Sequence, residues 1–159
     1  MRFGQLLVAS VLAVVSLLAG AQTVGVRGEQ SASEKRNEQV VLDFYDKAIN
    51  KKDFEAASAL LGDRYIQHNP TAGDGHEGLK KFIEALRTRL PNYKSRIVSV
   101  FTDGDFVLLH VHNVREPSTR GFAIVDIFRL DKNGEIVQHW DVRQEIPDPA
   151  TAANQNGMF

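Results

Sequence analysis

The spacing of hydrophobic positions changes between the first and second halves of the chain. Residues 34–50 carry apolar side chains at steps of three and four, which predicts one buried helical face. Asp53 is the predicted N-cap of a short second helix that stops at Gly62. A third amphipathic helix is predicted over residues 78–90, where Pro91 ends it.

The second half has the composition of β-strands. Four runs rich in β-branched and aromatic residues cover 93–102, 105–114, 120–130 and 135–144. The segments "DGD" and "DKNG" between them are hairpin-type turns, and such short links imply antiparallel neighbours. The predicted fold class is therefore α+β, with helices closing one face of a strongly curved, antiparallel or mixed sheet.

Alternation along the strands suggests a cavity with titratable groups. His110 and His112 lie two residues apart and so point to the same face. Asp126 is the only carboxylate in its run and has apolar neighbours, a costly position unless it is paired. With even-numbered residues of both strands on one face, we expect His110, His112 and Asp126 to share a cavity.

The last strand and the segment before the third helix add further candidates. Trp140 has the parity of Ile136, which predicts that Trp140 faces the interior and His139 the outer side of the sheet. The segment "RYIQHNP" brings polar side chains toward the predicted cavity. The candidate binding residues are His68, Tyr65, Asn69, Phe128 and Trp140.

The ends of the chain are predicted to lie outside the domain. Residues 1–21 combine an arginine, an apolar run and Ala-Gly-Ala, which predicts a secretory signal peptide cleaved after Ala21. An uncleaved membrane anchor is the alternative, although the run is shorter than the roughly 20 residues that a spanning helix needs. Residues 22–33 are expected to be a disordered linker, 34–147 the domain and 148–159 a C-terminal arm.

The amino-acid composition limits the kinds of functional site that the chain can form. The chain has no cysteine, which excludes disulfides, thiolate nucleophiles and cysteine-ligated metals. Its formal net charge of −1 does not suggest a nucleic-acid binder. The localisation that the signal peptide predicts is secreted or periplasmic, with no membrane attachment after cleavage.

Three segments together resemble a known family. "YIQHNP", "VDIFRL" and "GEIVQHWDV", in this order, make the chain similar to the SnoaL-like polyketide cyclases of the NTF2-like superfamily, and in particular to predicted SnoaL-like aldol-condensation-catalysing proteins. The resemblance runs from about residue 37 to the C-terminus. It implies a cone of helices on a curved sheet around a deep pocket, and chemistry without a cofactor or metal.

The resemblance also implies residue roles. Asp126 matches the family's acid/base aspartate, and His112 matches in spacing the histidine that assists it. His110 takes the neighbouring polar position, where the cyclases generally carry glutamine. The superfamily also includes isomerases, dehydratases, hydrolases and non-catalytic binders, so fold does not settle function.

Three functions are therefore open at this point. The first is a cofactor-independent enzyme in which Asp126 removes a proton next to a carbonyl group, with His112 or His110 assisting at the oxygen. The second is a module that binds a small apolar ligand carrying a carbonyl. The third is a metal enzyme with the two histidines and Asp126 as ligands and His68 as a fourth.

An oligomer is also expected. Both faces of the strand 105–114 are apolar, and helices can cover only one of them. We expect Val107, Leu109 and Val111 to be buried in a homodimer, because monomers rarely expose large apolar patches.

Overall fold

The structure is a computed structural model that describes residues 29–159. The predicted signal peptide and the linker residues up to 28 lie outside the described residues. Within the described part, no helix is long and apolar enough to cross a membrane.

Three α-helices and one π-helical turn make up the helical part. They are α1 (Ala32–Tyr45), η1 (Asp46–Asn50), α2 (Phe54–Ser58) and α3 (Gly75–Arg89). Ser31 caps α1 in a capping box with Glu34, so that the helix begins two residues before the predicted domain start at residue 34. Asp53 caps α2 by accepting a hydrogen bond from the backbone N–H of Ala56, as its sequence position predicted.

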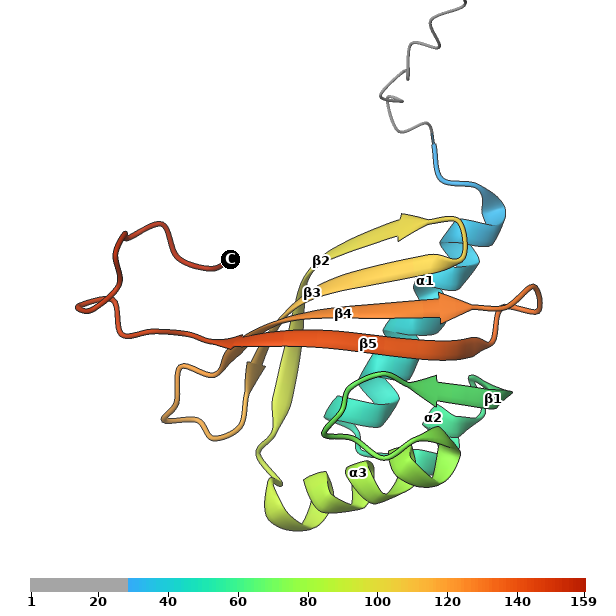
Figure 1. The fold of residues 1–159 in the computed structure, drawn as a ribbon, viewed down its shortest axis with the longest axis horizontal. Coiled ribbons are helices and arrows are strands. Elements are labelled where there is room, and N and C mark those ends of the chain that lie inside the picture. Colours follow the sequence, from blue (N-terminus) through green and yellow to red (C-terminus); the bar gives the residue numbers. More distant parts are fainter. Residues whose placement is uncertain (1–28) are drawn as a thin grey trace, which may run out of the picture.

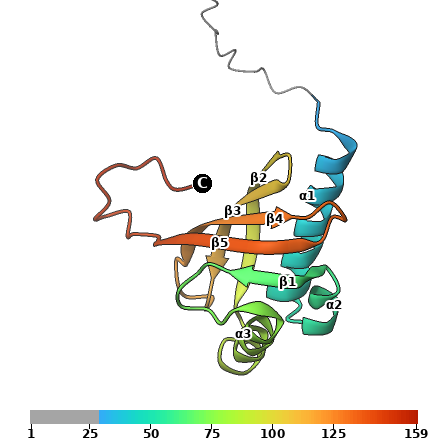
Figure 2. The ribbon, with the colours of Figure 1, turned by 45° about the vertical axis from the view of Figure 1, so that its right-hand side comes forward.

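Five strands form one mixed sheet. They are β1 (Leu61–Gln67), β2 (Lys94–Asp103), β3 (Phe106–Val114), β4 (Phe122–Leu130) and β5 (Ile136–Glu145). Their order is β1-β5-β4-β3-β2, with β1 parallel to β5 and the other pairs antiparallel. The predicted α+β class is confirmed: the α1 helix lies behind the sheet, and α3 lies beyond its β1 edge (Figures 1 and 2).

One face of the sheet packs on the helices and forms the core. Val107, Leu109 and Val111 lie on this inner face and have no exposed surface. The expectation that they form a dimer contact is therefore wrong, because α1 already covers them. The outer face carries the even-numbered residues of β3 instead.

Strand register decides which residues face the core. Leu109 of β3 lies opposite Asp126 of β4, so odd residues of β3 share the inner face with even residues of β4. Between β4 and β5 the register shifts, since Arg129 pairs with Gln138 while Leu130 pairs with Ile136. Val137 is thus the extra residue of a β-bulge, and the inward parity of β5 changes from even to odd after it.

A close approach of two backbones shapes the region between β1 and α3. A Cβ atom on Gly78 would lie 2.0 Å from the carbonyl oxygen of Gly73. Only glycine allows the loop to approach the first turn of α3 this closely. The loop and the helix thereby meet at the open side of the inner sheet face.

Candidate functional site

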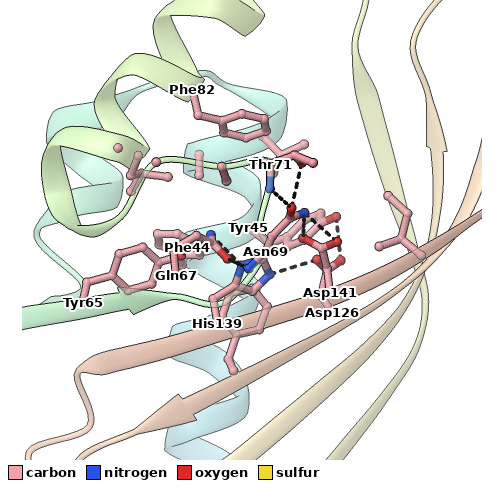
Figure 3. A pocket seen from close by; sticks show the side chains of 18 of the residues that line it. Phe44, Tyr45, Tyr65, Gln67, Asn69, Thr71, Phe82, Asp126, His139 and Asp141 are labelled. Carbon is pink, nitrogen blue, oxygen red and sulfur yellow. Dashed lines mark hydrogen bonds and ion pairs between the residues drawn. The ribbon is translucent and has the colours of Figure 1, made fainter.

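A cavity of about 150 Å³ lies between the inner face of the sheet and the helices (Figure 3). Residues from α1, β1, the loop before α3, α3, β4 and β5 line it. Its apolar wall includes Phe44, Tyr65, Leu79, Ile124 and Phe128. Its charged side chains are on β4 and β5, and further polar side chains come from α1, β1 and the loop before α3.

Asp126 is the buried acid of the cavity. The residue is 5% exposed, and each carboxylate oxygen has a hydrogen-bond partner. Oδ2 accepts a hydrogen bond from the Tyr45 hydroxyl at 3.1 Å, and Oδ1 lies 3.1 Å from Nε2 of His139. Burial of an anion without such partners would cost several kcal/mol, so these contacts are what hold the carboxylate in place.

Gln67 lies against one nitrogen of His139, and Asp126 lies against the other. The backbone N–H of Asn69 donates to Oε1 of Gln67 at 2.9 Å, which orients the amide. Nδ1 of His139 lies 2.9 Å from the amide nitrogen of Gln67 and 3.1 Å from its Oε1. A carboxylate accepts and does not donate, so the proton in the contact with Asp126 is on Nε2 of His139.

A second carboxylate lies beside the first. Asp141 is the cross-strand partner of Asp126 in the β4–β5 ladder. The side-chain amide of Asn69 donates to both oxygens of Asp141, at 2.9 and 2.7 Å. Asp141 is therefore oriented by the loop that follows β1, whereas His139 contacts Gln67 at the end of β1.

These contacts are spaced alike along the two segments. Gln67 and His139 are Cα partners in the parallel β1–β5 pair, and two residues later Asn69, just beyond β1, contacts Asp141. The amide of Gln67 thus contacts the histidine, and the amide of Asn69 contacts the aspartate. His139 and Asp141 share a face because they are two residues apart on a strand, and all four side chains line the cavity.

The cavity also holds neutral hydroxyl donors. Burial raises the pKa of Tyr45 well above its ordinary value, and the negative charge of Asp126 adds to the effect. Burial, followed by Asp126, likewise raises the pKa of Tyr65 and of Tyr93. All three phenols therefore stay protonated at neutral pH and act as hydrogen-bond donors.

Residues 41–139 match the family described as the SnoaL-like domain. The chain belongs to the SnoaL-like domain family. The match covers most of the described domain and includes Asp126 and His139, so the resemblance predicted from sequence is confirmed. Among curated proteins, none is significantly similar to this chain.

Solved structures show the same fold at low sequence identity. An NTF2-like protein from Cytophaga hutchinsonii is 22% identical with a TM-score of 0.56, over 72% of this chain and 91% of that one. A SnoaL-like protein from Burkholderia thailandensis is 16% identical with a TM-score of 0.57, over 70% and 96%. An LEH-like epoxide hydrolase of M. tuberculosis is 21% identical with a TM-score of 0.58, over 70% and 84%. The NTF2-like fold prediction is thereby confirmed.

In this SnoaL-like domain the two strand histidines do not face the cavity. His110 and His112 lie on the outer face, where their rings are 5.2 and 4.8 Å from that of Phe159 in the C-terminal arm. His112 also contacts the carbonyl of Arg120 through Nε2 at 2.9 Å. The prediction failed because the register pairs Asp126 with an odd residue of β3, so equal parity meant opposite faces.

The predicted positions of three aromatic side chains, one just after β1 and two on β5, are also wrong. His68 and Trp140 are not among the cavity residues and stack on each other, with ring centroids 4.3 Å apart and planes at 2°. His139, expected on the outer face, is the partner of Asp126 instead. The bulge at Val137 inverts the facing of both β5 residues relative to Ile136.

The other expected site residues do line the cavity. They are Asp126, Tyr65, Asn69 and Phe128. Sequence reasoning missed Tyr45, Gln67, His139 and Asp141 as members of the site. The signal that could have identified three of them is the spacing itself, because "QHN" and "HWD" each carry two polar groups two residues apart, at the end of β1 and on β5.

Part of the site has the donor set of a metal centre. Asp126, His139 and Asp141 offer ligand atoms that lie within 4.8 Å of one another. Two carboxylates and an imidazole are ligands that divalent metals accept. The expected set of His110, His112, Asp126 and His68 is wrong, since three of its members lie outside the cavity.

Proposed function

We propose that this SnoaL-like domain is an enzyme that performs acid/base chemistry on a small carbonyl compound without a cofactor. Asp126 acts as the general base that removes a proton next to the carbonyl group, as in enolate chemistry of the aldol or isomerase type. The observation that carries the proposal is the position of Asp126: a buried carboxylate at the cavity wall, oriented by Tyr45 and His139. A partly desolvated, oriented carboxylate is a suitable base for such a proton.

The same cavity offers donors for the oxygen that becomes negative. Tyr65 accepts a hydrogen bond from the Gln67 amide at 3.3 Å, which leaves its own proton available to a ligand. Tyr93 also lines the cavity and stays protonated because burial raises its pKa. A preorganised donor at a developing oxyanion contributes roughly a hundred- to a thousandfold in rate.

Asp126→Asn tests the role of the base. The variant should slow the exchange of protons next to a carbonyl by roughly a hundred- to ten-thousandfold, the usual loss for a general base. Exchange is measured by NMR in D₂O over a panel of small ketones. The melting temperature should stay the same or rise, because removing a buried charge relieves a desolvation cost.

Asp63→Asn is the matched control, since Asp63 is an exposed residue of β1. It should leave both exchange and melting unchanged. Undiminished exchange in the Asp126→Asn variant, together with a lower melting temperature, would show that Asp126 is a structural residue only.

The alternative is a module that binds a small ligand without turnover. The cavity combines apolar walls with convergent polar groups, as small-ligand sites do. This alternative predicts saturable binding of ketones with no proton exchange above the uncatalysed rate at any pH. An exchange rate that depends on pH and on Asp126 would exclude it.

We also propose that the protein is exported. The proposal rests on the arginine, the apolar run and the Ala-Gly-Ala segment that end at Ala21. The mature chain should begin at Gln22. N-terminal sequencing of the protein from culture medium or periplasm checks this, and a chain that retains Met1 would contradict cleavage.

A further inference from the structure

The inner face of β5 changes the sign of its charge along the strand. Asp141 lies beside Asp126, and two residues further on Arg143 also lines the cavity. Its guanidinium carbon lies 5.3 Å from the ring centroid of Phe122. The guanidinium carbon of Arg115 lies 4.8 Å from the centroid of the same ring. Arg143 thus adds a cation to a cavity that also carries the acidic Asp126 and Asp141, while Arg115 lies outside the lining, on the same phenyl ring as Arg143.

Neither arginine has an acidic partner. Among residues 29–159, the ion pairs involve other cations, and neither Arg115 nor Arg143 takes part in one. The Nε atom of Arg115 is buried without a hydrogen-bond partner. Stacking on an aromatic ring orients a guanidinium group while leaving its N–H donors for another ligand.

Tyr93 lies within the reach of both charge sets. Burial, and then Asp126, raise its pKa, whereas the positive charges of Arg115 and Arg143 oppose the rise. Tyr93 also lines the cavity, as do both acids and Arg143. The opposite charges therefore belong to one cavity rather than to distant surfaces.

We propose that Arg143, with Arg115 beside it on Phe122, is a carboxylate-binding subsite, and that the substrate is a small keto acid. This inference rests on the proposed function. Arginine binds carboxylates through two parallel N–H···O contacts. The acidic pair would repel a carboxylate, so the charged end of the substrate binds at Arg143 and the neutral ketone end faces Asp126.

The probes are 4-oxopentanoate and its methyl ester, which differ only in the charge of the end group. Dissociation constants come from NMR titration of the full mature chain, and proton exchange next to the ketone is measured in D₂O. The wild-type protein should bind the acid at least tenfold more tightly than the ester. Added salt should reduce this preference, because the contact is electrostatic and partly exposed.

Arg143→Gln should weaken binding of the acid by about tenfold or more and leave binding of the ester unchanged. Arg143→Lys keeps the charge but not the paired donors, and should give an intermediate loss. The matched control is Arg129→Gln, because Arg129 lies on the outer-facing register of β4, opposite Phe106. This control should bind both probes as the wild type does.

The outcomes separate the subsite from the proposed function. Equal binding of acid and ester, equal losses for both in Arg143→Gln, or no binding of either probe at millimolar concentration would overturn the subsite. Exchange of both probes that depends on Asp126 but not on Arg143 would leave the base standing and remove the subsite. A preference for the acid that depends on Arg143, without any exchange, would retain the subsite and refute the enzyme.

Discussion

At the residue scale, Asp126 is buried in the cavity wall with a hydrogen-bond partner at each carboxylate oxygen. Tyr45 and His139 each supply one hydrogen bond, and the raised pKa of Tyr45 ensures that its hydroxyl keeps its proton. Hydrogen bonds to a charged group contribute about 1.5–3 kcal/mol each. The remaining lone pairs of the carboxylate are directed at the cavity, where a substrate proton would be taken.

Gln67 should act as a positioning residue through His139. Gln67→Leu removes the amide from Nδ1, so that Asp126 alone is left to orient the imidazole. We expect ¹⁵N NMR to show a mixture of the two neutral tautomers where the wild type shows the Nε2–H form. Ketone proton exchange should fall by about tenfold, with kcat affected more than KM, since Gln67 touches no reacting atom.

Two further variants separate this role from a packing effect. Gln67→Glu offers only acceptors to Nδ1 and should stabilise the imidazolium form, visible in the same spectra. Gln138→Leu, a neighbouring change on β5 that leaves the cavity contacts intact, is the control and should alter neither signal. An unchanged tautomer in Gln67→Leu would refute the positioning role.

At the scale of elements, the sequence predicted the features that depend on the spacing of nearby residues. The helical faces, the Asp53 cap and the antiparallel strands all follow from spacing and turn residues, and they are present. Asp126 was predicted as a site residue because a lone carboxylate in an apolar strand is costly. A charged residue among apolar neighbours can be recognised in the sequence of one strand, without knowing which residues of the next strand lie opposite it.

Faces of strands could not be predicted, because they depend on register. In β3 both parities are apolar, so the hydrophobic pattern does not indicate which side is buried. Because odd residues of β3 pair with even residues of β4, His110 and His112 lie on the outer face and not on the expected inner face. The bulge at Val137 did the same for β5, and nothing in "EIVQHW" signals an extra residue.

At the scale of the whole molecule, the outer face of the sheet leaves several large apolar side chains exposed to solvent. Its exposed large apolar residues, with their exposed fractions, are Phe101 at 48%, Phe106 at 40%, Val125 at 36% and Val142 at 69%. The C-terminal arm contacts part of this face through Phe159, which packs on His110 and His112. In one chain the arm leaves the middle of β4 and β5 exposed to solvent.

A homodimer through this outer face remains our prediction, now with different residues from those the sequence suggested. Stable interfaces bury about 800 Å² on each partner, and a sheet face with a central apolar patch is suited to that. Light scattering at micromolar concentration should give twice the mass of one mature chain.

Val142→Glu should reduce the measured mass to that of the monomer, because two carboxylates would be buried without partners at a symmetric contact. Lys132→Gln, in the exposed turn before β5, lowers the charge of each chain by the same one unit and should leave the dimer intact. A wild-type protein with the mass of one chain at these concentrations would refute the dimer, whereas loss of the dimer in both variants would attribute it to net charge rather than to this face.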